Sequence, residues 1–428
     1  MMPSARYYAD PFAHQALIEK ENSGLVYLLE HNKVDELKRM YDLFSRITKA
    51  PEVGLLPGLE LLENKMAEHV VCRGKSIVVM PVDASGECKV DHIKFVKDLL
   101  DLKDQYDAII KDAFKNEKSF INKLNKSFEL FINQNARSPE FISLAMDHHL
   151  RGGGKKQGSG AHSEEEVEIQ LEKCLQLFRY ISEKDVFERY YKQHLSKRLL
   201  SDRSQSADME QKVIQMLKTE CGYQFTVKLE GMFKDINTSK TVREQFSSHL
   251  QQSADRSELT IDLQVKVLTT GYWPTQKAVQ CQLPPDVDKV CNVFKRFYLA
   301  QHNGRQLTWQ VNSGTAEVNS RYDRKYIITM PTFQMVALLL FADPSTTTLS
   351  FKDIENATKI PETDLKRTLQ SLACGQFRLL NKDPKSKDIK DTDSFSFNAN
   401  FSHKLIKFKV KHPRICGRPG KSYCPPIQ

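Results

Sequence analysis

The segment DVFERYYKQHLSKRLL, residues 185–200, places aromatic rings next to cationic side chains. Its ring and apolar residues recur at helical spacing on one face: Phe187, Tyr190, Tyr191, His194 and Leu195. Cations such as Arg189, Lys192 and Lys197 fall largely outside that face, where long side chains reach water. The pattern predicts a bundle helix with its rings in the core. His194 is interpreted as a core or boundary histidine, because no serine, cysteine or carboxylate partner can be nominated from the sequence.

Helical periodicity also dominates the first third of the chain. In VDELKRMYDLFSRI, residues 34–47, apolar residues recur at helical spacing, and the same spacing continues through 93–114 and 120–131. No alternating pattern interrupts these stretches, so we expect antiparallel helices of a stalk or repeat. The stretch RGGGKKQGSGAHS, residues 151–163, contains no large apolar residue and predicts a flexible linker.

The linker is similar to a phosphate-binding loop only superficially. The spacing G-x4-G-K-[ST] is absent from it, and no strand precedes it. GRPGKS at 417–422 fails as well, because its spacing is short and no apolar helix follows. Ser163, at the end of the linker, forms a capping box with Glu166 and predicts the start of the next helix.

The hydrophobic period then changes from helical to strand-like. In ELTIDLQVKVL, residues 258–268, apolar and polar side chains alternate, which predicts a half-buried strand. A helix is expected after Pro284-Pro285, ending at Asn303-Gly304. Three further strands are predicted, in RQLTWQV (305–311), TAEVN (315–319) and KYIITM (325–330). Residues 258–330 are therefore expected to form a small α/β unit.

Residues 331–402 have the pattern of a winged helix. Helices are expected at 332–341, after the capping residue Ser350, and at 361–374, with wing strands in FRLL and SFSFNANF. Winged helices often bind DNA through the third helix. Here that helix, PETDLKRTLQSLAC, has two acids against two bases, and its leucines are committed to packing. The strong phosphate attraction of a DNA-binding helix is missing, so these residues favour a protein scaffold over a DNA reader.

Composition excludes several other classes of protein. The chain has 428 residues and a net charge of +9, but residues 403–428 hold seven Lys or Arg and no Asp or Glu, so the body is nearly neutral. The longest apolar run, MVALLLFA at 335–342, is far too short to span a bilayer, and the N-terminus lacks the apolar region of a secretory signal. Nine scattered cysteines without a C-x2-C pair predict reduced thiols in the cytoplasm or nucleus, and no metal site.

Several long segments carry a resemblance to a known family. They are EKDVFERYYKQHLSKRLL (183–200), LKTECGYQFTVKLEGMFKDI (217–236), VLTTGYWPTQ (267–276), FKRFYLAQHNGRQLTWQ (294–310) and MPTFQMVALLLF (330–341). Together they resemble the cullin family, and most closely the cullin that recruits BTB-domain adaptors. The resemblance extends from about residue 20 to about residue 410.

The resemblance implies a multidomain, mainly α fold. The expected divisions are a partial cullin-repeat helical stalk (1–150), the flexible linker (151–163), a four-helix bundle (164–257), a small α/β sheet domain that binds a RING-box protein (258–330), a winged helix (331–402) and a basic divergent tail (403–428). The basic-aromatic helix at 185–200 would belong to the bundle.

Cullins are scaffolds of multisubunit RING ubiquitin ligases and not catalysts. The resemblance therefore implies a small zinc-containing RING-box partner, which recruits the ubiquitin-conjugating enzyme, so that this chain meets that enzyme only indirectly. The residues agree with this role, because we find no nucleophile motif, no metal cluster and no RING in the chain. We expect no catalytic residue, no cofactor and no membrane partner.

The resemblance also implies a binding mode, in which a strand of the RING-box protein completes the α/β sheet. The chief framework is expected at Leu259–Leu268 and Gln306–Val311, with the main chain of Lys325–Met330 nearby. The candidate partner-binding residues are Leu259, Ile261, Leu263, Val265, Val267, Leu307, Trp309, Val311, Tyr326 and Ile328.

The chain departs from the family pattern at both ends. Its first residue aligns late in the second helical repeat, so the first repeat, with which cullins hold their adaptors, is not in this sequence. BTB-adaptor binding by the usual route is therefore not expected. The match stops near Val410, no IVRIMK-like segment follows, and no modification lysine is assigned. We expect a chain truncated at both ends, which is an isoform, a paralogue or an incomplete gene product.

Two other functions remain open from the sequence. The chain could be a regulatory decoy that sequesters the RING-box protein without substrate. It could also bind nucleic acid through the winged helix and the basic tail, although the acids of the third helix disfavour that interpretation.

Overall fold

The computed structural model describes residues 18, 20, 21, 23–47, 58–79, 91–152, 164–204, 206–252, 261–274, 278–322, 324–343 and 346–410. The chain divides into two compact units. The first consists of Met1–Ile236 and Leu268–Pro274, and the second of Asn237–Val267 and Thr275–Gln428. Most of the predicted linker, its capping residue Ser163 and the tail from residue 411 lie outside the described residues.

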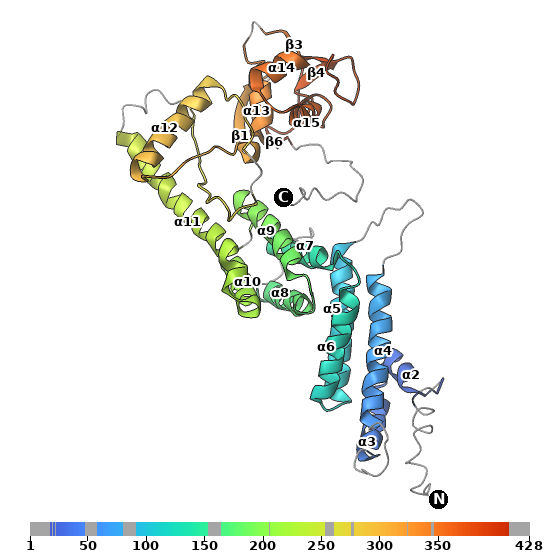
Figure 1. Ribbon diagram of the computed structural model, residues 1–428. Coiled ribbons are helices and arrows are strands. Elements are labelled where there is room, and N and C mark those ends of the chain that lie inside the picture. Colours follow the sequence, from blue (N-terminus) through green and yellow to red (C-terminus); the bar gives the residue numbers. More distant parts are fainter. Residues whose placement is uncertain are drawn as a thin grey trace, which may run out of the picture. The chain divides into compact units, whose positions relative to one another are not determined.

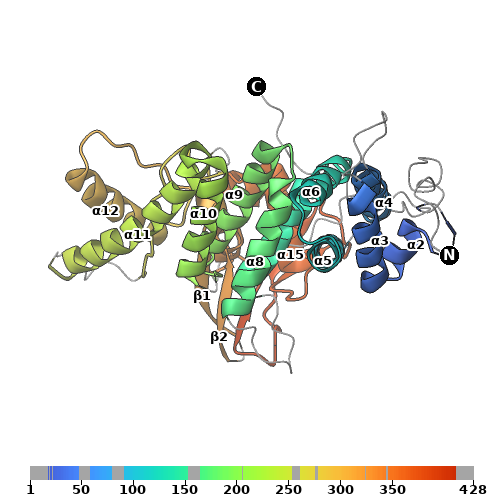
Figure 2. The same ribbon diagram turned by 90° about the horizontal axis from the view of Figure 1, so that it is seen from below.

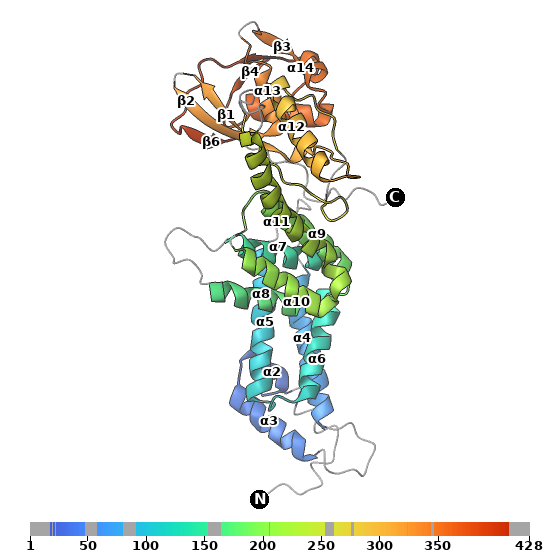
Figure 3. The same cartoon turned by 90° about the vertical axis from the view of Figure 1, so that its left-hand side faces the viewer.

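All regular elements in the described part of the first unit are helices. Helix α4 packs along α6, α5 packs on α7, and α7 contacts both α8 and α9 (Figures 1 and 3). Helix α3 lies beside α4 (Figure 2). The helices are α2 (Leu25–Glu30), α3 (Val34–Ile47), α4 (Gly58–Val78), α5 (His92–Asp112), α6 (Lys118–Ile132), α7 (Ser138–Leu150), α8 (Glu164–Arg179), α9 (Lys184–Leu200), α10 (Ala207–Cys221) and the first part of α11 (Tyr223–Gln252).

Local sequence signals explain where several of these helices begin and end. The carboxylate of Asp91 accepts hydrogen bonds from the N–H groups of Ile93 and Lys94 and so caps α5. Helix α10 ends at Gly222, whose φ of 84° few other residues adopt. The predicted helices at 34–47 and 185–200 are confirmed as α3 and α9.

Helix α9 buries part of the predicted face and leaves Tyr190 and His194 half-buried, and one of its cations is also buried. Phe187, Tyr191 and Leu195 are fully buried, and Arg189 and Lys197 are exposed. Arg198, by contrast, has no exposed surface. The expectation that the charges of this helix lie at the surface is therefore wrong for Arg198, because acids on two other helices surround it.

The second unit combines helices with two small sheets. One sheet has the strand order β1-β2-β6 and the other β3-β5-β4. The pairing in the first sheet is antiparallel between β1 and β2 and parallel between β2 and β6. The helices and strands of the second unit are the second part of α11, α12 (Pro285–Gln301), β1 (Thr315–Arg321), β2 (Lys325–Pro331), α13 (Thr332–Leu339), β3 (Thr348–Ser350), α14 (Phe351–Thr358), α15 (Glu362–Ala373), β4 (Leu380–Asp383), β5 (Ser394–Phe397) and β6 (Lys407–Lys409).

Helices α13, α14 and α15, with the sheet β3-β5-β4, form the predicted winged helix (Figure 3). Ser350 and Asp353 make the expected capping box at the start of α14. The strands predicted at 315–319 and 325–330 are confirmed as β1 and β2. Strand β4 of the wing begins at Leu380, the last residue of FRLL, and therefore three residues later than expected.

Two expected boundaries differ from the structure. Strand β2 runs directly into α13, and Tyr326 and Ile328 share one core with Phe333 and Val336, so no division falls at residue 330. The physical reason is that one face of β2 is apolar and is buried under the winged-helix elements. The predicted tail also begins too early, because β6 pairs with β2 and Phe408 is buried.

The bundle predicted for 164–257 ends within α11 rather than after it. The first unit stops at Ile236, and beyond it Val242 and Phe246 bury their side chains against α12. In the part of the chain that the structure describes, every helix is too short or too polar to cross a membrane.

Candidate partner-binding site

A cluster of aromatic and aliphatic side chains joins α11 to α12 in the second unit. Phe246 of α11 lies 5.0 Å from Phe294 and 5.2 Å from Phe297, between ring centroids. We call the six buried residues the aromatic cluster: Val242, Phe246, Val293, Phe294, Phe297 and Tyr298. It provides a rigid apolar platform, because ring pairs at these separations attract one another beyond their burial.

Two segments without regular structure cover this platform. Residues 261–268 contribute three half-buried side chains, those of Leu263, Val265 and Val267. Residues 305–310 contribute Leu307 and Trp309, and the Trp309 ring lies 5.9 Å from that of Phe294. We call these two stretches the cover segments.

The side chains of the cover segments alternate as they would in strands. Gln264 is exposed between half-buried Leu263 and Val265, and Thr308 is exposed between half-buried Leu307 and Trp309. Yet within the described residues neither cover segment belongs to a strand. The strands predicted at 258–268 and 305–311 are therefore not formed, and Val311 begins a short 3-10 turn instead. Alternation specifies which side chains are buried, but a strand also needs a neighbour to pair with its main chain.

Helix α12 ends where the second cover segment begins. Gly304 has a φ of 80°, as predicted for the stop at Asn303-Gly304. Directly after this turn, the guanidinium of Arg305 donates a hydrogen bond of 2.8 Å to the Tyr298 hydroxyl. This bond ties the start of the segment back to the helix and directs Leu307 and Trp309 onto the cluster.

The ten predicted partner-binding residues do not lie together in the structure. Five of them meet on the aromatic cluster, namely Leu263, Val265, Val267, Leu307 and Trp309. Ile261 is exposed, and Leu259 lies outside the described residues. Val311 packs against the winged-helix core instead of the aromatic cluster.

Tyr326 and Ile328 lie in neither cover segment and have no exposed surface. Their strand, β2, is central, with β1 on one side and β6 on the other, so it offers no complete edge to a partner. The expectation that the main chain of β2 lies near a partner strand is not supported. The alternation in KYIITM that suggested a site is explained by the core of this chain.

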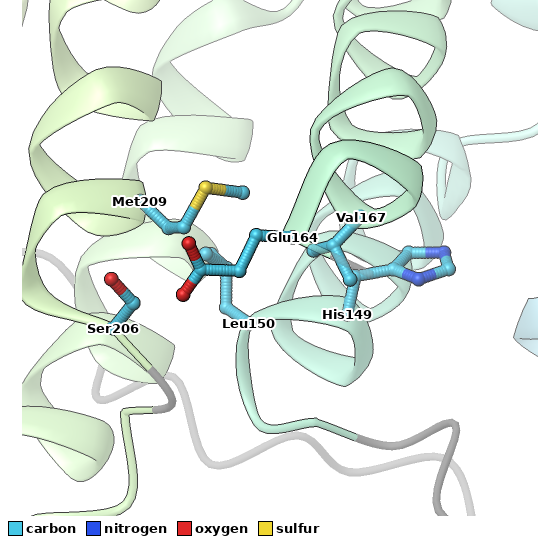
Figure 4. A pocket seen from close by; sticks show the side chains of 6 residues that line it. All are labelled: His149, Leu150, Glu164, Val167, Ser206 and Met209. Atoms are coloured by element: carbon cyan, nitrogen blue, oxygen red, sulfur yellow. The ribbon is translucent and has the colours of Figure 1, made fainter. Parts of the chain in front are cut away.

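The described residues include an open groove and a small cavity. An open groove of about 450 Å³ between α11 and α12 is lined mainly by polar side chains, among them Glu244, His249 and Gln252. A second cavity, in the first unit, has a volume of about 10 Å³, roughly that needed for one water molecule. Figure 4 shows that the His149 imidazole points away from the Glu164 carboxylate, so these side chains form no acid–base pair.

Three of the described cysteines have thiols whose reactivity is lowered by burial. Burial raises the pKa of the Cys174 thiol to about 12 and that of Cys281 and Cys291 to about 11, so these thiols stay protonated at neutral pH. Among the described residues no group of His, Cys, Asp or Glu side chains could hold a metal ion.

An ion cluster in the first unit was not foreseen from the sequence. The guanidinium of Arg198 contacts Glu210 and Asp147, which belong to α10 and α7. Burial alone would lower the pKa of Arg198, but the hydrogen bonds and charge of Glu210 raise it above its usual value. The sequence contains a weak indication that Arg198 is buried, because Arg198 follows Tyr191 and Leu195 at helical spacing and so lies on the same helix face.

Two family models match the chain, one of the cullin alpha solenoid domain over residues 13–243 and one of the cullin alpha+beta domain over residues 267–401. Cullin-3A of Arabidopsis thaliana is 48% identical over 400 residues, which are 92% of this chain and 51% of that protein.

Two further relatives give a similar result. Cullin-3 of Dictyostelium discoideum is 42% identical over 431 residues, covering 92% of this chain and 53% of that protein. Cullin-4A of Homo sapiens is 41% identical over 397 residues, covering 92% and 49%. The chain spans about half the length of the curated relatives it matches.

Proposed function

The chain belongs to the cullin family, is similar to cullin-3, and on this premise we propose that it is a non-catalytic scaffold subunit of a multisubunit RING ubiquitin ligase. The proposed partner is a small zinc-containing RING-box protein, which binds by adding a strand along the cover segments. The RING would bring the ubiquitin-conjugating enzyme, so the ligase chemistry comes with the partner.

The observation that carries this proposal is the pair of cover segments, which lie on the aromatic cluster but belong to no strand in the described residues. An extended segment outside any sheet leaves its main-chain N–H and C=O groups to water, and such groups are available for pairing with a strand of another protein. Gln264 and Thr308 sit in such segments, and their main chains have no partner within the described residues. An added strand would supply those partners, which is the usual basis of strand addition in peptide recognition.

A scaffold accelerates transfer by proximity rather than by bond chemistry. Holding a substrate and a ubiquitin thioester on one rigid body raises their effective concentration. The raised pKa values of the buried thiols are consistent with this division of labour, because a protonated thiol cannot accept ubiquitin as a thioester intermediate. Adaptors and substrates remain open, since the matched relatives are about twice the length of this chain.

The experiment uses the whole chain, co-expressed with a tagged RING-box protein, and two matched pairs of variants. Gln264→Pro and Thr308→Pro each remove one N–H donor while keeping the extended backbone that proline favours. Gln264→Ala and Thr308→Ala are the controls, because both side chains are exposed. We expect the alanine variants to co-purify with the partner like the parent chain, and each proline variant to bind at least about tenfold more weakly, which is ~1.4 kcal/mol.

Two results would overturn the proposal. One is failure of the parent chain to bind the RING-box protein at all. The other is transfer of ubiquitin by the purified chain without that partner. Thermal unfolding of each variant establishes that weaker binding does not come from loss of the fold.

A further inference from the structure

One serine of α11 forms two hydrogen bonds with the first cover segment. The Ser239 hydroxyl accepts a bond of 2.8 Å from the N–H of Val267 and donates one of 3.1 Å to the C=O of the same residue. The Ser239 side chain is almost entirely buried. A single side-chain oxygen therefore satisfies both main-chain groups of Val267.

This pair of bonds determines which way the segment faces. In an extended chain the N–H and C=O of one residue point to the same edge, and those of the next residue point to the opposite edge. The groups of Val267 point to Ser239 of α11. The alternating burial of Leu263, Gln264 and Val265 favours an extended chain, in which the main-chain groups of Leu263 and Val265 lie on that same edge. The main-chain groups of Asp262 and Gln264 lie on the other edge.

We infer that Ser239 is a positioning residue, which takes the place of a neighbouring strand on one edge of residues 262–267 and so directs the partner strand to the edge of Asp262 and Gln264. This inference rests on the proposed function, because it states with which edge of residues 262–267 the proposed partner strand would pair. Ser239 itself need not touch the partner.

The end of the cover segment has its own anchor within the first unit. The Asp235 carboxylate accepts hydrogen bonds of 2.7 Å from the Thr269 N–H and 2.8 Å from the Trp273 indole N–H. Asp235 lies on the same helix as Ser239, one turn earlier.

The edge is tested by residue-resolved amide hydrogen exchange on the full chain, alone and with the RING-box protein as the probe. We expect the Gln264 amide to exchange at least about tenfold more slowly in the complex. The Val267 amide should be protected in both states, and the Leu263 and Val265 amides should change little. New protection at Leu263 and Val265 without protection at Gln264 would place the partner on the wrong edge and overturn the inference.

The positioning role is tested with Ser239→Ala, Ser239→Thr and the control Ser248→Ala. Ser248 is an exposed serine of the same helix, and its hydroxyl bonds to the C=O of Glu244 within that helix. Ser239→Ala should speed exchange of the Val267 amide in the free chain. It should also slow association with the RING-box protein about tenfold, with a smaller effect on dissociation, because the segment is no longer pre-arranged. Ser239→Thr keeps the hydroxyl and should restore both properties, and Ser248→Ala should change neither.

These outcomes separate the inference from the function on which it rests. If the parent chain binds the partner but Ser239→Ala leaves association unchanged and only lowers the unfolding temperature, Ser239 is structural and the inference fails alone. If the parent chain does not bind, the proposed function fails. Unchanged exchange of the Val267 amide in free Ser239→Ala would overturn the positioning role in either case.

Discussion

The Nε atom of Arg198 lies 2.5 Å from Oε1 of Glu210, and neither side chain has any exposed surface. The same guanidinium lies 2.5 Å from Oδ1 of Asp147. The buried cation of Arg198 on α9 thus joins α7 to α10. Arg198, Glu210 and Asp147 together carry a net negative charge, which Arg151 beside Asp147 offsets. Such a cluster is sensitive to the loss of a single member, because the remaining charges stay buried.

Arg198→Met should therefore destabilise the first unit strongly. It leaves the carboxylates of Asp147 and Glu210 without their buried counter-ion, and we expect a loss of about 3–5 kcal/mol in the free energy of unfolding. Lys197→Met is the control, because the neighbouring Lys197 is exposed, and it should change stability by less than about 0.5 kcal/mol. Denaturant unfolding of both variants measures the difference, and equal midpoints would contradict the role of the cluster.

His194 should make stability dependent on pH. Burial lowers the pKa of His194 to about 4, although Asp147 opposes this shift. The unfolded chain, with an ordinary histidine pKa of about 6.5, then binds the proton more readily than the folded chain. Stability should fall as the pH is lowered from about 6.5 toward 4. Urea midpoints measured at several pH values should decline less steeply for His194→Gln, and an identical slope would contradict the assignment.

Phe294→Ala should remove the platform under both cover segments. Phe294 contacts the rings of Phe246 and Trp309 and is fully buried, so the cavity should cost about 3–5 kcal/mol in unfolding free energy. Binding to the RING-box protein should fall as well, even below the unfolding temperature. The exposed neighbour Lys295 supplies the control Lys295→Ala, which should match the parent chain in calorimetry and in pull-down.

Gly231→Ala should displace the turn that follows the first cover segment. A Cβ atom at Gly231 would lie 2.5 Å from the Tyr272 ring, which is closer than packed atoms come. We expect about 1–3 kcal/mol of destabilisation in thermal unfolding. Tyr272→Ala on the Gly231→Ala background should recover part of that loss, since the clash is then gone. Additive effects of the two substitutions would argue against the contact.

Binding of duplex DNA should be weak. The cations of α15 are already paired, with Lys366 Nζ 2.6 Å from Glu362 and 2.9 Å from Asp391. At physiological salt we expect only non-specific affinity, with a Kd on the order of 10⁻⁴–10⁻⁶ M in fluorescence anisotropy. A much tighter, salt-dependent complex that is lost on deletion of residues 411–428, which leaves β6 intact, would favour the nucleic-acid interpretation instead.

The amino-acid sequence alone determined the family and several of the helices. Helical periodicity and capping residues act locally, so α3, α9 and the Ser350 cap of α14 could be located without tertiary information. Alternation likewise identified Leu263, Val265, Leu307 and Trp309 as half-buried, because the side-chain period of an extended chain is two.

Only the tertiary structure decided what those patterns pack against. The apolar side chains of β2 are buried in this chain's own core. Residues 262–267 alternate in sequence as β2 does, but in the described residues no strand pairs with them, and the Val267 N–H donates to the Ser239 hydroxyl instead. The burial of Arg198 has the same origin, since its partners lie 51 and 12 residues away in sequence. Hydrogen bonds and ion pairs of this kind join segments that are distant along the chain, so no local period can encode them.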